Sequence, residues 1–260
     1  IVFGDWSSDV CSSDLMIFDN YTLVFGTSAD PIHQGHIDLI TDGTKALIDQ
    51  GIAVSRIILM PVYRRNPILH EIKGSLPLTY KHRFHICQLA THEIARNLAG
   101  LVQEVSVSRL EQTLVSENQR PNYTAETLSA LRDTLDEKTG IVFMLGEDVF
   151  SGDPPGFSKW YKVDRILELA LIAICPRPGF GMNQDYLEHI LSKGAKLVFL
   201  KGLRTKNISS HQLKLRLKAG EDPLQLARDG WISYSIATYI KEVDLVRLWQ
   251  ALEPADENKK

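Results

Sequence analysis

The sequence predicts an α/β protein with a Rossmann-like three-layer fold, in which helices flank a mainly parallel sheet. Short apolar, β-rich runs alternate along the chain with amphipathic stretches. This alternation is typical of a parallel sheet that is covered by helices on both faces. The chain has 260 residues, of which 44% are hydrophobic, so it is long enough to bury a full core.

The first predicted strand is the apolar run YTLVFG at residues 21–26. A helix is predicted over residues 35–51, because apolar residues recur at helical spacing and Gly51 is a suitable C-cap. The second strand is predicted at residues 55–62 and ends at a proline, which cannot donate to a strand ladder. The segment 64–77 contains proline, glycine and several basic side chains, and it is a predicted loop.

The alternation continues to the C-terminus, and no repeat or long linker interrupts it. In chain order the next predicted elements are a helix at 78–98, a strand at 101–111, a helix at 123–140 with Thr124 as a possible cap, a strand at 141–150, a helix end followed by a strand within 166–179, an extended run at 195–202, and helices at 209–220 and 233–252. We therefore expect residues 16–260 to form a single domain with a helical C-terminal part. The charged end, EPADENKK, is expected to fray.

Residues 1–15 are expected to lie outside this fold. The segment IVFGDWSSDVCSSDL is rich in Ser and Asp, has no helix or strand periodicity, and stops abruptly at Met16. Its DVCSSDL portion resembles the translation of a common sequencing adapter. We expect the segment to be non-native, and the alternative is a natural disordered extension.

Composition narrows the expected partners and compartment. The formal net charge is −3, whereas a protein that reads a phosphate backbone normally carries an excess of basic residues, so nucleic acid is not an expected partner. No apolar run approaches the roughly 20 residues that span a bilayer, so no membrane is expected. Cys11, Cys87 and Cys175 are odd in number and widely spaced, which argues against a disulfide framework and favours a cytoplasmic location. The oligomeric state stays open, with a homo-oligomer as one possibility.

The stretch FGTSADPIHQGH, residues 25–36, combines several features of a phosphate site. In an open α/β sheet, ligands bind outside the carboxyl ends of the strands, often at the turn after the first strand. Gly26, Thr27 and Ser28 are small enough to let backbone amides approach an anion. The helix that begins near Gly35 directs its N-terminal N–H groups to the same place.

Two histidines, His33 and His36, lie at the end of this stretch. Each can donate a hydrogen bond to a phosphate oxygen, and the bond strengthens as charge develops in a transition state. The structural alternative places His36 on a helix face and His33 in a solvated loop. The combination of small turn, helix start and two imidazoles favours the phosphate site.

The same stretch resembles the first motif of the nucleotidylyltransferase superfamily, Gly-Gly-Thr-Phe-Asp-Pro-x-His-x-Gly-His. The residues that match are Gly26, Asp30, Pro31, His33, Gly35 and His36. Thr27 replaces the second glycine, and Ser28 and Ala29 replace Thr-Phe.

Five stretches, taken in order along the chain, narrow the resemblance to bacterial nicotinate-nucleotide adenylyltransferases. They are RPNYTAETL, LGEDVF, WYKVDRILELALIAICPRPG, ISSHQLKLRLKAG and SIATYIKEVDL. The chain departs from the family motifs where Asn122 replaces a serine, His211 a threonine and Lys214 an arginine. Lysine keeps the charge of arginine but loses its bidentate fork.

The resemblance implies an adenylyltransferase of NAD biosynthesis. Such an enzyme joins ATP and nicotinate mononucleotide to give the deamido-NAD dinucleotide and pyrophosphate, and nicotinamide mononucleotide is a second candidate acceptor. The mononucleotide's 5′-phosphate attacks the α-phosphate of ATP, so catalysis is expected to consist of positioning and charge stabilisation. Mg2+ is expected to arrive with ATP, because the motifs offer no all-protein oxygen cage and His82 and His85 lack a third ligand.

The resemblance also implies roles for individual residues. The expected catalytic residues are His33 and His36, of which His36 stabilises the reacting α-phosphate. The expected ATP-binding residues are Gly26, Thr27, Ser28, Gly35, Ile208, Ser209, Ser210, Lys214 and Arg216. Asp148 is expected to contact a ribose hydroxyl or a magnesium-bound water. The expected mononucleotide-binding residues are Asp30, Lys73, Arg83, Tyr123, Thr124, Trp160 and Arg177.

Several of these residues have a structural alternative. Ser209, Ser210 and Thr124 could instead cap their helices. Asp148 could be an exposed turn residue, and Trp160 could pack in the core. Lys73 and Arg83 could be solvated surface charges.

Two alternatives for the function also remain. One is another superfamily member such as a pantetheine-phosphate adenylyltransferase, although that group is typically shorter and lacks the Tyr-Thr and Trp segments. The other is a catalytically silent nucleotide-binding homologue, which the departures at Thr27, Ala29, His211 and Lys214 keep open and the retained histidines disfavour.

Overall fold

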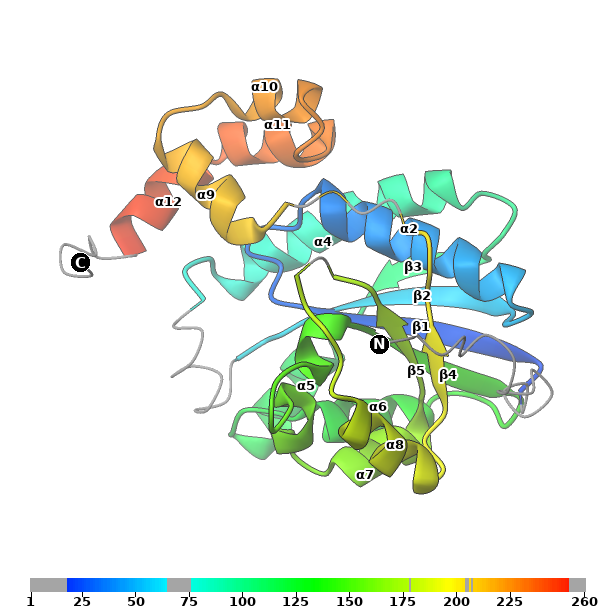
Figure 1. Cartoon of the computed structure of the whole chain (residues 1–260). Helices are drawn as coiled ribbons and strands as arrows, with labels where there is room; N and C mark the ends of the chain where they lie inside the picture. The colour runs from blue at the N-terminus through cyan, green and yellow to red at the C-terminus, as the bar shows by residue number, and fades with distance from the viewer. Residues whose placement is uncertain (1–17, 65–75, 178, 204–205, 207, 253–260) are drawn as a thin grey trace.

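A six-stranded parallel sheet forms the middle layer of the computed structural model (Figure 1). The structure describes residues 18–64, 76–177, 179–203, 206 and 208–252. The strands are β1 (Asn20–Thr27), β2 (Val54–Pro61), β3 (Glu104–Val107), β4 (Thr139–Gly146), β5 (Leu171–Cys175) and β6 (Leu197–Phe199). Their order is β3-β2-β1-β4-β5-β6, and every neighbouring pair is parallel. This is the doubly wound arrangement, so the predicted Rossmann-like class is confirmed.

Helices cover both faces of this sheet (Figure 1). One face carries α2 (Gln34–Asp49) and α4 (Tyr80–Asn97), and the other carries α6 (Thr124–Arg132), α7 (Val163–Leu169) and α8 (Gln184–Ser192). Side chains alternate between the two layers, because Leu23 packs in the core under α2 and α4 whereas Val24 packs in the core under α6 to α8. Burial of both faces explains why the central strands are predominantly apolar.

Four C-terminal helices lie together beside α4 at one end of the molecule (Figure 1). They are α9 (Ser210–Lys218), α10 (Pro223–Arg228), α11 (Tyr234–Glu242) and α12 (Leu245–Leu252). α11 contacts α4, and α12 contacts α9 and α11. Buried side chains such as Leu213 and Trp249 belong to the same hydrophobic cluster as α2 and α4, so the C-terminal helices share a core with the sheet.

Several element boundaries differ from the sequence predictions. The predicted strand 101–111 contains only the short β3, because α5 (Leu110–Asn118) begins within the same run. The predicted helix 123–140 ends at Arg132, and Tyr123 rather than Thr124 occupies its N-cap position. The predicted helix 233–252 is two helices, since Asp244 adopts a left-handed conformation with φ of 49° and interrupts the helical ladder.

Other differences concern short elements. The predicted strand 141–150 ends at Gly146, and a single 3-10 turn, η1 (Glu147–Phe150), follows it. A second 3-10 turn, η2 (Gly156–Lys159), precedes α7. Helices α5, α8 and α10 were not predicted, although α8 has a recognisable start: the Asn183 side chain accepts a hydrogen bond of 2.9 Å from the backbone N–H of Tyr186.

The expectations for residues 1–15, 65–75 and 253–260 fall outside the described residues. Within the described part of the chain, no helix has both the length and the apolar composition to cross a membrane. Cys87 and Cys175 are buried free thiols. Cys11 is not among the described residues.

Candidate active site

The predicted phosphate stretch lies where the strand order of the sheet reverses. β1 pairs with β2 on one side and with β4 on the other, so the chain crosses from one half of the sheet to the other at β1. The stretch leaves the carboxyl end of β1 and enters α2 at Gln34. Doubly wound sheets bind their ligands in the crevice at this position, and the topology therefore places both histidines at the expected ligand site.

The turn after β1 is closed by its own side chains. The Thr27 hydroxyl accepts a hydrogen bond of 3.0 Å from the backbone N–H of Ala29. Ala29 has a φ of 53°, a left-handed conformation that costs a non-glycine residue about 1 kcal/mol or more. Thr27 and Ala29 are buried, whereas Gly26 is exposed and Ser28 is partly exposed. The substituted GTSA turn is thus a defined structure, with Gly26 and Ser28 on its accessible side.

The two histidines stack on each other at the start of α2. Their ring centroids are 3.8 Å apart, and the ring planes differ by 32°. The backbone N–H of His33 donates to Nδ1 of His36 at 3.3 Å. Nδ1 of His36 therefore acts as an acceptor, and the ring proton resides on Nε2, where it can be donated. His33 is 5% exposed, and its Nδ1 has no hydrogen-bond partner among the described residues.

Both imidazoles are held neutral. The pKa of His33 is lowered to about 2, chiefly by burial and then by the neighbouring His36 and Arg177. Burial and then Arg177 lower the pKa of His36 to about 4. Charged forms are disfavoured by desolvation and by nearby cations. At neutral pH the histidines can thus donate N–H hydrogen bonds, while the fixed positive charge of this region comes from Arg177.

Arg177 follows β5 and is oriented by two acidic residues at the end of β4. Its Nη1 lies 2.8 Å from Oδ2 of Asp148, and its backbone N–H donates to Oε2 of Glu147 at 3.0 Å. Gly146 makes this arrangement possible, because a Cβ there would clash with Oδ1 of Asp148. The carboxyl ends of β1, β4 and β5 therefore bring together His33, His36, Asp148 and Arg177.

Gly35 permits the close packing of His33 against the first turn of α2. A Cβ at position 35 would lie 3.1 Å from Nδ1 of His33 and 3.2 Å from the backbone oxygen of Lys206. Such contacts are tighter than ordinary van der Waals contact. The absence of a side chain at position 35 therefore lets His33 pack closely against the first turn of α2.

The start of α9 lies directly against the histidine stretch. Ser209 caps α9, since its Oγ accepts from the N–H of Gln212 at 3.1 Å and Gln212 Oε1 accepts from the N–H of Ser209 at 3.0 Å. Oγ of Ser210 donates to the backbone oxygen of Pro31 at 2.9 Å. Ile208, Ser209 and Ser210 are all partly exposed at this position.

Three predicted binding residues have protein partners instead of facing open solvent. Nζ of Lys214 lies 3.2 Å from Oδ2 of the buried Asp30. Nε of Arg216 donates to Oε1 of Glu221 at 2.7 Å. These ion pairs give Asp30, Lys214 and Arg216 contacts that shape the protein beside the site.

Arg83 is 2% exposed, so the surface-charge alternative for this residue is wrong. Its guanidinium donates to the backbone oxygens of Ser28 at 3.1 Å, Val62 at 2.6 Å and Leu78 at 3.1 Å. Arg83 thereby joins the turn after β1 to the end of β2 and the start of α4. Lys73 lies outside the described residues.

Aromatic residues gather at the N-cap of α6 and in the segment before α7. The rings of Tyr123 and Tyr161 are 4.6 Å apart, and Tyr161 is 43% exposed. Trp160 packs against Phe157, with centroids 5.2 Å apart, and remains partly exposed. Thr124 is the first residue of α6. Trp160 therefore combines the core packing of the structural alternative with an accessible side.

Two residues that contribute here were not predicted. Glu111 is buried beneath the Tyr-Thr segment, where the Thr127 hydroxyl donates to its Oε1 at 2.6 Å, and burial raises its pKa. Its sequence neighbours Arg109, Gln112 and Thr113 are polar, so no local pattern marked Glu111 as buried. Trp249 hydrogen-bonds to Asp30 from 219 positions away in the sequence, and no local pattern marks that contact.

A family model described as cytidylyltransferase-like matches residues 24–216, which is most of the chain. The chain belongs to the cytidylyltransferase-like family. The matched region includes the histidine stretch, the aromatic segment and the start of α9. The predicted resemblance is thus confirmed at the level of the family.

Curated relatives of this cytidylyltransferase-like chain match along nearly their whole length. A Dehalococcoides mccartyi protein named "Probable nicotinate-nucleotide adenylyltransferase" is 27% identical over 225 residues, which cover 86% of this chain and 96% of the relative. A Salmonella typhimurium protein named "Nicotinate-nucleotide adenylyltransferase" is 25% identical over 238 residues, which cover 86% and 97%.

A solved structure titled "Plasmodium falciparum nicotinic acid mononucleotide adenylyltransferase complexed with NaAD" has the same fold. Its TM-score to this chain is 0.61, with 18% sequence identity. The match covers 88% of this chain and 98% of that chain.

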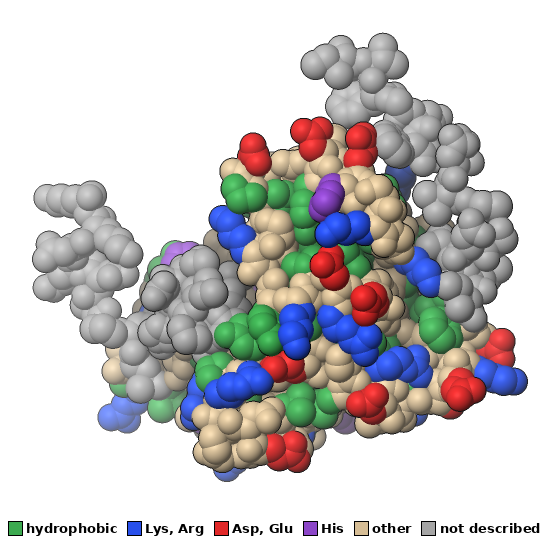
Figure 2. Space-filling view, turned by 90° about the horizontal axis from the view of Figure 1, so that it is seen from below, with side chains coloured by type: hydrophobic (Ala, Val, Ile, Leu, Met, Phe, Trp, Pro, Cys, Tyr) green, Lys and Arg blue, Asp and Glu red, His purple; other side chains and the backbone are tan. Residues whose placement is uncertain are grey.

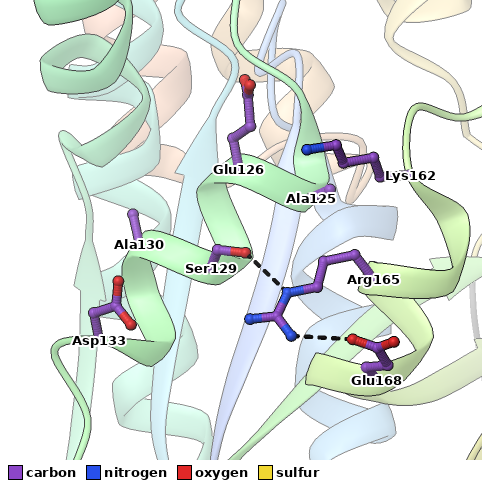
Figure 3. Close-up of a pocket in the computed structure, with 8 residues that line it drawn as sticks. All are labelled: Ala125, Glu126, Ser129, Ala130, Asp133, Lys162, Arg165 and Glu168. Atoms are coloured by element: carbon purple, nitrogen blue, oxygen red, sulfur yellow. Dashed lines mark hydrogen bonds and ion pairs between the residues drawn. The ribbon is translucent and has the colours of Figure 1, made fainter.

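An open pocket of about 490 Å³ between α6 and α7 is separate from the histidine site (Figure 3). Its lining residues are Ala125, Glu126, Ser129, Ala130, Asp133, Lys162, Arg165 and Glu168, and none of them is a predicted site residue. Nε of Arg165 donates to Oγ of Ser129 at 3.4 Å, and its Nη1 donates to Oε2 of Glu168 at 3.0 Å. On the face of the molecule seen in Figure 2, basic and acidic side chains are interspersed.

Proposed function

We propose that this chain is a nicotinate-nucleotide adenylyltransferase, which transfers the adenylyl group of ATP to nicotinate mononucleotide in NAD biosynthesis. The observation that carries the proposal is the pair of neutral, stacked histidines beside Arg177 at the strand-order reversal. Full-length similarity to relatives of that name supports the choice of acceptor.

In the proposed reaction, a 5′-phosphate oxygen of the mononucleotide attacks the α-phosphorus of ATP. The bond from the α-phosphorus to the bridging oxygen of the β-phosphate breaks, and pyrophosphate leaves. Nε2–H of His36 donates to an α-phosphate oxygen, and Arg177 offsets the developing negative charge. Hydrogen bonds and charges that are fixed before the reaction cost no reorganisation at the transition state.

The described cysteines support direct transfer over a covalent intermediate. Burial raises the pKa of Cys87 and raises that of Cys175 to about 12, so both thiols stay protonated at neutral pH. A protonated thiol is a poor nucleophile. In the proposed mechanism the two substrates react directly with each other, and the protein contributes alignment and electrostatic stabilisation.

For ATP we assign the accessible side of the β1 turn and the starts of α2 and α9. The assigned residues are Gly26, Ser28, Gly35, Ile208, Ser209 and Ser210. N-terminal N–H groups of helices favour anions, and the contact between Ser210 and Pro31 sets the two helix starts side by side. Thr27, Lys214 and Arg216 support this surface through their intramolecular bonds.

Magnesium enters the proposed reaction as its complex with ATP. Across the described residues, no group of three His, Cys, Asp or Glu side chains is arranged to hold a metal ion. Asp148 is half-buried beside Arg177 and is assigned to a ribose hydroxyl or to a water on that magnesium.

For the mononucleotide we assign Tyr123, Thr124, Trp160 and Arg177. Trp160 offers a flat face for the pyridine ring, and such aromatic contacts contribute about 0.5–1.5 kcal/mol beyond area burial. Asp30 and Arg83 are buried and fully engaged in the protein, so we reassign them from ligand contact to support of the β1 turn.

We also propose a cytoplasmic location, which the free thiols of Cys87 and Cys175 support. We further propose small-molecule substrates and no nucleic-acid partner, which the formal net charge of −3 supports.

The test is to mix the protein with magnesium-ATP and, separately, nicotinate mononucleotide, nicotinamide mononucleotide and phosphopantetheine, and to measure pyrophosphate release. We expect the fastest release with nicotinate mononucleotide. Preference for phosphopantetheine would overturn the assignment as a nicotinate-nucleotide adenylyltransferase and favour the pantetheine-phosphate alternative. Absence of release with every acceptor would support a catalytically silent homologue.

A further inference from the structure

The histidine stretch is held by the last described helix of the chain. Trp249 of α12 is completely buried, and its Nε1–H donates to Oδ1 of Asp30 at 2.9 Å. Oδ2 of the same carboxylate lies 3.2 Å from Nζ of Lys214 on α9. Asp30 is only 6% exposed, so two donors from the C-terminal helices fix a buried carboxylate that lies three residues before His33.

Two more hydrogen bonds connect the same parts of the chain. Oγ of Ser210 donates to the backbone oxygen of Pro31 at 2.9 Å, and the backbone N–H of Gln34 donates to the oxygen of Trp231 at 2.8 Å. Residues 30, 31 and 34 thus each bond to the C-terminal helices or the loop between them. His33 lies within this short segment, and His36 packs on His33.

We propose that Trp249 is a positioning residue for adenylyl transfer, which acts through Asp30 on the location of His33 and His36. The inference rests on the proposed function. A reacting group displaced by about 1 Å can lose about a hundredfold in rate, so a donor that fixes the histidine stretch affects turnover without touching a substrate. The family model ends at residue 216, so Trp249 lies beyond the part of the chain that the model matches.

The competing explanation is that Trp249 only fills the core between α9, α11 and α12. The substitution Trp249→Phe separates the two roles, because it keeps an aromatic ring and removes the N–H donor. Removal of the donor leaves the buried Oδ1 of Asp30 unsatisfied, which allows the carboxylate to move. Asp30→Asn is a second, nearly isosteric variant that keeps the Oδ1 acceptor and removes the charge that pairs with Lys214.

Tyr239→Phe is the matched control. The Tyr239 hydroxyl, on α11, lies 2.7 Å from Nδ1 of His82 on α4, so its removal also deletes one aromatic hydrogen bond between a C-terminal helix and the rest of the protein. That bond does not reach residues 30–36. Tyr239→Phe should therefore lower the melting temperature without changing turnover.

The experiment measures kcat, both KM values and the melting temperature for the wild type and the three variants. For Trp249→Phe we expect kcat to fall about tenfold to a hundredfold, with both KM values within about twofold of the wild type. Asp30→Asn should also lower kcat while both KM values stay nearly unchanged. Because the two residues act through one hydrogen bond, kcat of the double variant Trp249→Phe/Asp30→Asn should be no lower than that of the slower single variant. Unchanged kcat in Trp249→Phe, or an equal loss of kcat in Tyr239→Phe, would overturn the inference.

A second readout needs no activity. Nitrogen-15 NMR of the imidazole side chains reports the tautomer and environment of His33 and His36. Trp249→Phe should shift these resonances, whereas Tyr239→Phe should shift those of His82 and its neighbour His85 and leave those of His33 and His36 unchanged. An inactive wild type contradicts the proposed function, while unshifted His33 and His36 resonances in Trp249→Phe contradict the positioning role.

Discussion

The charge state of His33 and His36 decides what these residues can do for a phosphate. Burial and the guanidinium of Arg177 lower the pKa of His36 to about 4 and that of His33 to about 2. Neutral imidazoles cannot supply a full positive charge, but they can donate hydrogen bonds that strengthen as negative charge develops. A neutral donor next to a fixed arginine suits a reaction that moves charge onto a leaving pyrophosphate.

Replacement of His36 by alanine should reduce kcat by about 10²- to 10³-fold, the usual effect of losing one transition-state donor. The melting temperature should change little, because the hydrogen bond that His36 accepts from His33 is long, at 3.3 Å. Steady-state kinetics and a thermal melt check this. His189→Ala, on the exposed surface of α8, is the control and should alter neither quantity. A collapsed melt for His36→Ala would instead support a structural role.

The lowered histidine pKa values also predict how stability depends on pH. Below the ordinary value of 6.5 the unfolded chain binds protons at both histidines, while the folded protein resists protonation down to about pH 4 at His36 and about pH 2 at His33. The unfolded state then binds more protons, so the free energy of unfolding falls as pH falls. Each histidine contributes up to about 1.4 kcal/mol per pH unit in this range.

His33→Gln removes one of these two sites. Urea unfolding at pH 7 and pH 5 measures this effect. The free energy of unfolding should decrease less between pH 7 and pH 5 for His33→Gln than for the wild type. Identical losses for the two proteins would show that His33 is not held neutral in the folded state.

At the scale of elements, the first turn of α2 depends on the absence of a side chain at position 35. Gly35→Ala should lower kcat, because the added Cβ would lie 3.1 Å from Nδ1 of His33 and 3.2 Å from the oxygen of Lys206. Alanine is favoured over glycine within helices by about 1 kcal/mol, so the fold should survive. Gly181→Ala is the matched control, since no heavy atom lies within 4 Å of its added Cβ. Equal kinetics for Gly35→Ala and the wild type would contradict the packing argument.

The elements that sequence predicted well are those whose pattern is local. β1, β2, β4 and β5 are long apolar runs because both faces of the sheet are buried. Gly51 was a suitable C-cap for α2, and it adopts φ of 83° directly after the helix. The break at Asp244 could not be predicted, since apolar residues continue at helical spacing on both sides of it.

At the scale of the whole molecule, the site depends on contacts between distant parts of the sequence. The motif predicted that His33 and His36 lie at the end of β1, and they do. The roles of Asp30 and Arg83 could not be inferred from sequence, because their partners Trp249, Val62 and Leu78 come from separate elements. Because Asp30 and Arg83 are buried and hydrogen-bonded within the protein, we assign them to support of the β1 turn and not to ligand contact.

Ligand binding should stabilise the folded chain as a whole. Magnesium-ATP at a hundredfold excess over its Kd should raise the free energy of unfolding by about 2.7 kcal/mol. The His36→Ala variant should keep most of this gain, because His36 is assigned to the transition state. Thermal melts with and without magnesium-ATP check this. Complete loss of the gain in His36→Ala would place His36 in ground-state binding instead.

The central claim is that adenylyl transfer occurs directly between the two substrates at the histidine site. The most direct test is a single-turnover reaction with excess protein, magnesium-ATP labelled with phosphorus-32 at the α-phosphate, and nicotinate mononucleotide. With direct transfer, we expect the label to appear in the dinucleotide and none to remain on the denatured protein. Label retained on the protein, or no labelled dinucleotide, would contradict it.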